Sequence, residues 1–222
     1  MQERMTTKLR RLLKEKDYLM APCAYDALTA KCIEASGFDL IGTTGYGMHG
    51  AMIGTPDTGL LGMNETVAAL SKMQNAVDIP ILADGEGGYG SALNVIRMIR
   101  EYEKTGIGGV FIEDQTQPPN CPFIMKPQLI SKEEMVGKIK AAVDARRDDD
   151  LVIGNKLPEL LHLRRPGCRG DIREHFYCVL VFHGHLPGFV AVIGHIHSFP
   201  VIQKIPKCRF VPIHTSHFTT PA

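Results

Sequence analysis

The segment ILADGEGGYG, residues 81–90, places two carboxylates directly after a short apolar run. Asp84 and Glu86 follow the run, and four glycines lie among and after them. Two functions suit such a loop: its backbone N–H groups could bind a phosphate, or its acids could bind a metal ion. A pyrophosphate approaching here would meet two negative charges where hydrogen-bond donors are needed, so the residue types favour the metal.

Acids follow other apolar runs as well. Asp57 lies in the loop GTPDTGLLG, and Glu113 ends the run GVFIE. If these runs are parallel strands, their carboxyl ends meet at one edge and the acids converge. Two unit charges about 4 Å apart repel by about 4 kcal/mol at an effective dielectric of about 20, so such a cluster needs a cation. Oxygen ligands without His or Cys favour Mg²⁺ or Mn²⁺.

Each acid taken singly has a simpler interpretation, as a helix cap or as the partner of a solvated lysine. Only their repetition at successive strand ends favours a shared site. The glycines allow another hypothesis, because residues 85–90 (GEGGYG) and 45–50 (GYGMHG) both match the G-x-G-x-x-G pattern. A pattern that occurs twice in a chain with 22 glycines is weakly specific, so a dinucleotide-binding α/β domain is the lower-ranked alternative.

The elements that must position these residues alternate along the first 154 residues. Apolar runs predict strands within 18–22, 38–44, 79–84, 108–114 and 151–154. Helical spacing and end signals predict helices over 7–17, 25–37, 63–77, 91–106 and 131–147. Continuous apolar runs are typical of parallel strands buried on both faces. The alternation predicts an α/β fold, either a (β/α) barrel or an open doubly wound sheet.

Local signals within these helices lead to two further expectations. Asn64 and Ser91 are the residue types that cap helix N-termini, so each is expected to begin its helix. In the segment 25–37, Leu28, Cys32 and Ala35 recur at helical spacing, which predicts that they share one side of that helix.

The bulk composition excludes several classes of protein. The 222 residues are 44 % hydrophobic and 22 % charged with a net charge of +1, so no overall field attracts nucleic acid or a membrane surface. The start, MQERMTTKLRRLLKEKD, has no apolar block and predicts neither a signal peptide nor a membrane span. Six scattered cysteines without a CxxC pair are typical of free thiols, which predicts a reducing compartment, cytoplasmic or mitochondrial.

The composition changes near residue 154. All ten methionines precede this point, eight of the nine histidines follow it, and 21 of the 24 acids precede it. Residues 155–222 show no continuing strand–helix alternation, which predicts an atypical, His-rich and poorly ordered tail. Such a change is typical of a shifted reading frame. A zinc or copper site at the HGH and HIH pairs is the less favoured interpretation of the tail.

Several motifs then carry a resemblance, in consistent order and spacing: APCAYDALTAKCIEASGFDLIGTTGYG, GTPDTGLLGMNETV, LADGEGGYG and GVFIEDQTQPPNCP. Over roughly residues 5–154 the chain resembles the isocitrate lyase/phosphoenolpyruvate mutase superfamily, in particular its methylisocitrate lyase-like and carboxyphosphonoenolpyruvate mutase-like members. The resemblance implies a (β/α)8 TIM-type barrel, of which residues 1–154 supply about five βα units. It also implies Mg²⁺ and an α-keto acid or its enolate, next to which C–C or P–C bonds are cleaved or formed.

The resemblance also implies individual roles. The metal would be held, directly or through water, by Asp84, Glu86 and Glu113. The substrate carboxylate would be bound by Thr44, Gly45 and Tyr46, with Asp57 nearby, and Cys121 would be the acid that protonates a departing enolate. The family has Asp where Glu86 stands and Ser-Gly-Gly where residues 44–46 stand.

Two departures from the family pattern leave the activity open. The gating loop carries Pro119-Asn120-Cys121-Pro122-Phe123 in place of Lys-Lys/Arg-Cys-Gly-His, and its prolines predict a stiffer loop. The family's Arg-bearing segment and three further strands have no counterpart after residue 154, and neither do the exchanged C-terminal helices of its oligomers. The chain is therefore either a Mg²⁺-dependent lyase or phosphonomutase-like enzyme for a small carboxylate, or an inactive truncated relative whose five strands leave both sheet edges open.

Overall fold

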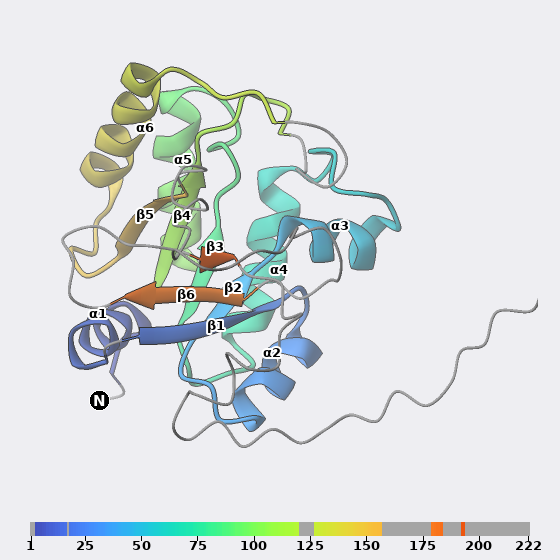
Figure 1. The fold of residues 1–222 in the computed structure, drawn as a ribbon, viewed down its shortest axis with the longest axis vertical. Coiled ribbons are helices and arrows are strands. Elements are labelled where there is room, and N and C mark those ends of the chain that lie inside the picture. Colours follow the sequence, from blue (N-terminus) through green and yellow to red (C-terminus); the bar gives the residue numbers. More distant parts are fainter. Residues whose placement is uncertain (1–2, 17, 120–126, 157–178, 184–191, 194–222) are drawn as a thin grey trace, which may run out of the picture.

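The computed structural model describes residues 3–16, 18–119, 127–156, 179–183 and 192–193 (Figure 1). Its strands form one sheet in the order β5-β4-β3-β2-β1-β6-β7. They are β1 (Tyr18–Ala24), β2 (Ile41–Thr43), β3 (Ile81–Asp84), β4 (Gly109–Glu113), β5 (Val152–Lys156), β6 (Val179–His183) and β7 (Val192–Ile193). The helices are α1 (Met5–Glu15), α2 (Ala27–Ala35), α3 (Gly45–Ile53), α4 (Met63–Gln74), α5 (Ala92–Lys104) and α6 (Lys132–Ala145).

Strands β1 to β5 run parallel to one another, and helices connect them. The predicted α/β class is therefore confirmed, and all five strands expected before residue 154 are present. Parallel strands joined by helical crossovers bring all their carboxyl ends to one edge. That edge carries Thr43, Asp84 and Glu113 as the last residues of β2, β3 and β4.

Two apolar clusters receive the alternating side chains of the sheet. On β3, Leu82 enters one cluster, whereas Ile81 and Ala83 enter the other, as the period of two requires. Helix α1 completes the first cluster with Leu9 and Leu12, both at most 5 % exposed. Helices α4, α5 and α6 pack on the second and larger cluster. The strands are thus buried on both faces, which is why they were apolar throughout.

Helix α3 was not predicted. Three of its nine residues are glycine, so the segment lacks the apolar periodicity by which the other helices were found. Its ends are set by short-range contacts instead: the Thr44 hydroxyl accepts from the Gly47 N–H at 3.4 Å, and Gly54 ends the helix in the left-handed region at φ 65°.

One expectation about the other helices was wrong, and two were right. Ser91 is the N-cap of α5, as predicted, but α4 begins after Gly62, so Asn64 lies inside that helix. On α2 the predicted stripe points outward: Leu28 is 73 % exposed, while Ala30 is fully buried. Ala30 is the α2 residue that enters the larger apolar cluster.

Segments beyond residue 178 add two strands to the sheet. β6 pairs antiparallel with β1, from Tyr18 opposite His183 to Pro22 opposite Val179, and β7 pairs antiparallel with β6 (Figure 1). The expectation that both edges of the five-stranded sheet stay open was therefore wrong at β1. An edge strand carries unpaired backbone N–H and C=O groups, and a β-prone run such as VLVFH satisfies them. Of the histidines in the HGH and HIH pairs, His183 is the last residue of β6. His185, His195 and His197 lie outside the described residues.

Candidate functional site

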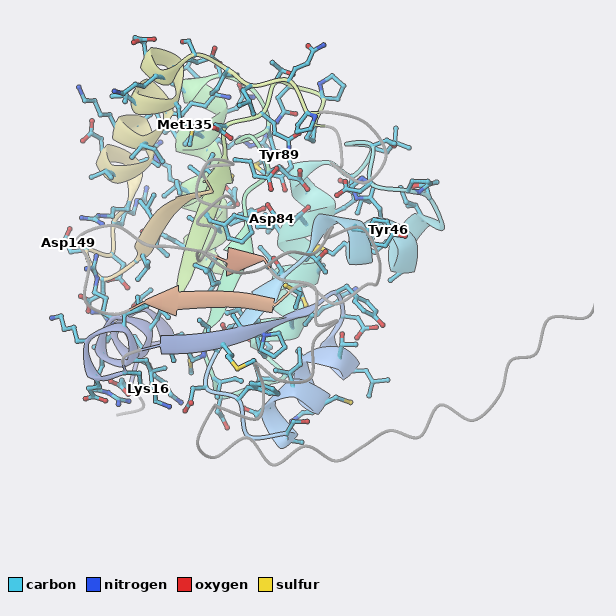
Figure 2. The ribbon with its side chains drawn as sticks, viewed as in Figure 1. Lys16, Tyr46, Asp84, Tyr89, Met135 and Asp149 are labelled. Atoms are coloured by element: carbon cyan, nitrogen blue, oxygen red, sulfur yellow. The ribbon has the colours of Figure 1, made fainter. Side chains whose placement is uncertain are left out.

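Three strand ends are tied together by backbone hydrogen bonds at the carboxyl edge of the sheet. The Thr43 hydroxyl, at the end of β2, accepts from the Asp84 N–H at 2.7 Å. The Glu113 N–H, at the end of β4, donates to the Glu86 carbonyl at 2.7 Å. Figure 2 shows Asp84 beside the start of α3, which carries Tyr46. The predicted acids of β3 and β4 therefore belong to one connected region.

Gly45, Asp57 and Glu86 come from three separate segments and meet at one point. A Cβ at position 45 would lie 2.5 Å from a Glu86 carboxylate oxygen and 3.1 Å from an Asp57 carboxylate oxygen. A side chain at position 45 would have to displace the Glu86 carboxylate, because the two carboxylates occupy the space that it would need. This juxtaposition joins two predicted substrate-binding residues to one predicted metal ligand.

The loop after β3 is shaped so that Glu86 turns toward this point. Glu86 has φ 50° and Tyr89 has φ 59°. Both lie in the left-handed backbone region, which residues other than glycine rarely adopt. The Glu86 N–H donates to an Asp84 carboxylate oxygen at 2.9 Å. Gly85 is required because a Cβ would lie 2.8 Å from the Phe111 carbonyl of β4. Backbone strain of this kind persists where surrounding contacts over-determine it and is concentrated at functional sites.

Glu113 is oriented within the protein rather than toward open solvent. Its side chain is buried, and it accepts a hydrogen bond from the Gln115 side-chain amide at 2.6 Å. Among the described residues, no group of three or more His, Cys, Asp or Glu side chains is placed to hold a metal ion. The three predicted ligands Asp84, Glu86 and Glu113 share a region without forming a closed three-carboxylate cage, and their role as ligands stays a prediction.

A buried chain of hydroxyl groups holds the acid loop from behind. The Tyr102 hydroxyl of α5 donates to the Asp84 carbonyl at 3.0 Å, and the hydroxyls of Tyr89 and Tyr102 are 2.9 Å apart. The Tyr89 hydroxyl also lies within hydrogen-bond distance of the Thr66 hydroxyl on α4, at 3.1 Å. Burial raises the pKa of both phenols, and the nearby Glu86 charge raises that of Tyr89 further, so both stay neutral. Sequence analysis missed this chain, since Tyr102 continues the apolar stripe of its helix.

A buried lysine also reaches the acid loop. Lys138 of α6 has a side chain that is only 3 % exposed, and its ammonium donates to the Gly87 carbonyl at 2.9 Å. Its Nζ also lies 3.6 Å from Glu134, one turn earlier on the same helix. Lysines are rarely buried unless they are paired, so the burial of Lys138 depends on these contacts of its ammonium group. No signal in the sequence distinguishes Lys138 from Lys140.

His49 connects the start of α3 with the loop that follows it. Its buried Nδ1 lies 2.9 Å from the Gly45 carbonyl oxygen and 3.3 Å from an Asp57 carboxylate oxygen. Its Nε2 accepts the N–H groups of Leu60 at 3.1 Å and Leu61 at 3.2 Å. His49 was not predicted as a site residue, because its segment GYGMHG was interpreted only through its glycines.

The remaining predicted site residues are Thr44, Tyr46 and Cys121. Thr44 caps α3, and Tyr46 on the first turn is 39 % exposed. Cys121 and most of the expected gating loop lie outside the described residues, so the predicted acid is untested. Pro119, the last described residue before them, is buried against Gly59, where an added Cβ would lie 2.7 Å from the proline ring.

A cavity of about 490 Å³ lies at the opposite, amino-terminal ends of the strands. Its lining includes Gln74, Val77, Gly106 and Ile107, and it contains none of the predicted site residues. Catalytic groups of parallel α/β folds gather at the carboxyl ends, so the position of this cavity does not favour it as the active site. Within the described part of the chain, no helix is both long and apolar enough to cross a membrane.

The chain resembles known proteins over about two thirds of its length. The family model described as phosphoenolpyruvate phosphomutase matches residues 9–164. The 2,3-dimethylmalate lyase of Eubacterium barkeri is 47 % identical over 146 residues, which cover 66 % of this chain and 50 % of that protein. The chloroplastic carboxyvinyl-carboxyphosphonate phosphorylmutase of Arabidopsis thaliana is 37 % identical over 151 residues, covering 68 % and 44 %.

A solved structure extends the likeness to the fold. Phosphonopyruvate hydrolase in complex with oxalate and Mg²⁺ matches with a TM-score of 0.61 and 31 % identity, covering 69 % of this chain and 52 % of that one. The chain spans about half the length of the relatives that it matches.

Proposed function

The chain belongs to the phosphoenolpyruvate phosphomutase family, as its motifs implied, and from this premise we propose that it binds a small keto-acid-derived carboxylate together with Mg²⁺. The reaction class is that of a lyase or phosphonomutase-like enzyme, which cleaves or forms a C–C or P–C bond beside the carboxylate. The observation that supports this most directly is the meeting of Gly45, Asp57 and Glu86 at the carboxyl edge of the sheet.

The residues present suit a hard cation. Asp84, Glu86 and Glu113 would supply oxygen ligands from adjoining segments, and Mg²⁺ usually keeps several waters, so it does not require three carboxylates in direct contact. When bound, the ion would supply a Lewis acid that stabilises negative charge on an enolate. Glutamate at position 86 is longer than the family's aspartate, and its left-handed backbone conformation, φ 50°, sets the direction from which its side chain reaches Gly45.

The substrate would be held at the start of α3. Thr44 and Gly45 stand at the N-terminus of this helix, where the direction of the backbone N–H groups and the helix dipole favour a carboxylate. Asp57 lies beside Gly45, close to where such a ligand would sit. Cys121, if it keeps the role that the motif implies, would deliver the proton to the departing enolate.

Calorimetry with Mg²⁺ and oxalate, an enolate mimic, tests the proposal. We expect oxalate to bind only when Mg²⁺ is present, and Asp84→Asn to weaken binding by at least about 100-fold, because a charged ligand is replaced by a neutral one. Glu133→Gln, an exposed acid on the first turn of α6, is the control and should bind as the parent does. Oxalate binding that ignores Mg²⁺, or no binding by a protein that melts cooperatively, contradicts the proposal.

A second candidate is a binding protein without catalysis. The substituted loop Pro119–Phe123 favours it. Assays with 2,3-dimethylmalate, methylisocitrate, oxaloacetate and phosphonopyruvate separate the two candidates. Turnover that is lost in Cys121→Ser supports the enzyme, whereas Mg²⁺-dependent oxalate binding without turnover of any of the four supports the binding protein.

A further inference from the structure

We propose that His49 is a positioning residue: a neutral imidazole, protonated on Nδ1, that holds the Asp57 carboxylate and the Gly45 backbone in the arrangement the site requires. The inference rests on the proposed function, because Gly45 and Asp57 matter only if a carboxylate binds beside them. His49 itself is buried and would not touch the substrate.

The proton on the ring is located by the hydrogen bonds. Nε2 faces two backbone N–H groups, those of Leu60 and Leu61, and a nitrogen that accepts from donors carries no proton of its own. Nδ1 faces two acceptors, the Gly45 carbonyl at 2.9 Å and an Asp57 oxygen at 3.3 Å. Every contact is satisfied by one tautomer, with the proton on Nδ1.

This single ring joins three pieces of backbone. Gly45 begins α3, Asp57 lies in the middle of the following loop, and Leu60 and Leu61 lie near the end of that loop. The loop spans Thr55–Gly62 between α3 and α4 and has no secondary structure of its own. His49 therefore acts through its neighbours, as the outer partners of metal and substrate ligands do.

A histidine buried only to fill the core would show the same packing, so the test must separate the two ring nitrogens. Glutamine places its carbonyl oxygen near the position of Nε2 and keeps the Leu60 and Leu61 bonds, but offers Asp57 no donor. Asparagine places its amide N–H near the position of Nδ1 and keeps that donor, but releases Leu60 and Leu61. Leu12→Ala is a control that loses stability far from the site, because Leu12 belongs to the apolar cluster that α1 completes.

We expect His49→Gln to melt near the parent temperature yet bind Mg²⁺-oxalate roughly 10- to 100-fold more weakly, the usual cost of losing an outer partner. His49→Asn should melt earlier but keep affinity within about threefold, below that range, because the donor to Asp57 is kept. Leu12→Ala should also melt earlier with unchanged affinity. In ¹⁵N NMR spectra, assigned by difference from the variants, the His49 ring should show a protonated Nδ1 and an unprotonated Nε2.

Three results would overturn the inference. One is parent-like affinity in His49→Gln, another is affinity that follows melting temperature across all three variants, and the last is a proton on Nε2. These differ from failure of the proposed function. If the parent protein itself gives no Mg²⁺-dependent oxalate binding, the function falls and the inference falls with it. If the parent binds and His49→Gln binds equally well, only the inference falls.

Discussion

The two ends of the parallel sheet both carry acids, but they hold them in different ways. At the amino-terminal end, Arg4 pairs with Asp148 at 2.9 Å and with Asp150 at 3.0 Å. At the carboxyl end, the donors described for Asp84 and Glu113 are a backbone N–H and a side-chain amide, neither of which is charged. In Figure 2, Asp149 and Lys16 lie toward the left edge of the molecule, away from Asp84 and Tyr89.

This difference indicates what each end contributes. An ion pair with arginine reduces the net charge of a carboxylate and contributes to stability. A neutral donor orients a carboxylate without cancelling its charge. The amino-terminal end is therefore expected to affect folding, and the carboxyl end is expected to affect ligand binding.

The largest expected effect comes from substituting Gly45, at the start of α3, and it is compared with the same substitution at Gly137 in α6. Gly45→Ala places a methyl group 2.5 Å from Glu86 and should weaken Mg²⁺-oxalate binding by about 100-fold, the cost of a displacement of about 1 Å at a site. Gly137→Ala is the matched control, since a Cβ there meets nothing within 4 Å inside α6. It should leave binding unchanged and raise stability by roughly 0.5–1 kcal/mol. Equal calorimetric affinities for the two variants would break the comparison.

A smaller effect is expected behind the acid loop. Lys138→Met removes the donor to the Gly87 carbonyl and should cost roughly 1–3 kcal/mol in the free energy of unfolding, because that carbonyl stays buried. Oxalate affinity should fall as well, since Gly87 directly follows Glu86. Lys140→Met, on the exposed side of the same helix, should change stability by no more than about 0.5 kcal/mol. Urea denaturation measures both variants, and equal midpoints would show that Lys138 anchors nothing.

The smallest effect concerns the amino-terminal end. Burial alone would raise the pKa of Asp148, but hydrogen bonds from Thr6 and the Asp150 N–H, with the Arg4 charge, hold it below the ordinary value of 3.8. A lowered pKa in the folded state contributes stability that is present above the unfolded pKa and is lost as the pH falls through the folded pKa.

Asp148→Asn should therefore lose about 1 kcal/mol at neutral pH and less at acid pH, where the parent has lost the same contribution. Thermal melts across pH 2–7 measure the change, and Asp149→Asn is the control. Oxalate affinity at neutral pH should not change in Asp148→Asn, because this acid belongs to the other end of the sheet. A loss of affinity there would contradict the division between the two ends.

Short-range patterns were sufficient for the framework. The five parallel strands are apolar throughout because both faces are buried, so a single sequence shows where they lie and which acids follow them. The position of Asp84 and Glu86 directly after such a run was enough to place them at the carboxyl edge. Ser91 likewise marked the start of its helix, since capping depends on neighbours three residues away.

Residues that act at long range could not be found in this way. Lys138 and Gly87 are 51 residues apart, and Leu61 and His49 are 12 apart, so nothing in their immediate neighbours announces the contact. Helix α3 was not predicted because its glycines do not favour a helix. Gly45 makes room for Glu86, and Gly47 makes room for Tyr25. The pairing of β6 with β1 escaped because a β-prone run does not indicate which edge it will join.

The sequence by itself determined the alternation of strands and helices, the family, and the carboxylates that follow the strands, because each depends on local periodicity or on adjacent residues. Only the tertiary structure decided that Glu86 and Asp57 meet at Gly45, that His49 joins their segments and that β6 covers one edge of the sheet. Those outcomes depend on which distant surfaces pack together, and packing is settled by shape and hydrogen-bond satisfaction across the whole fold.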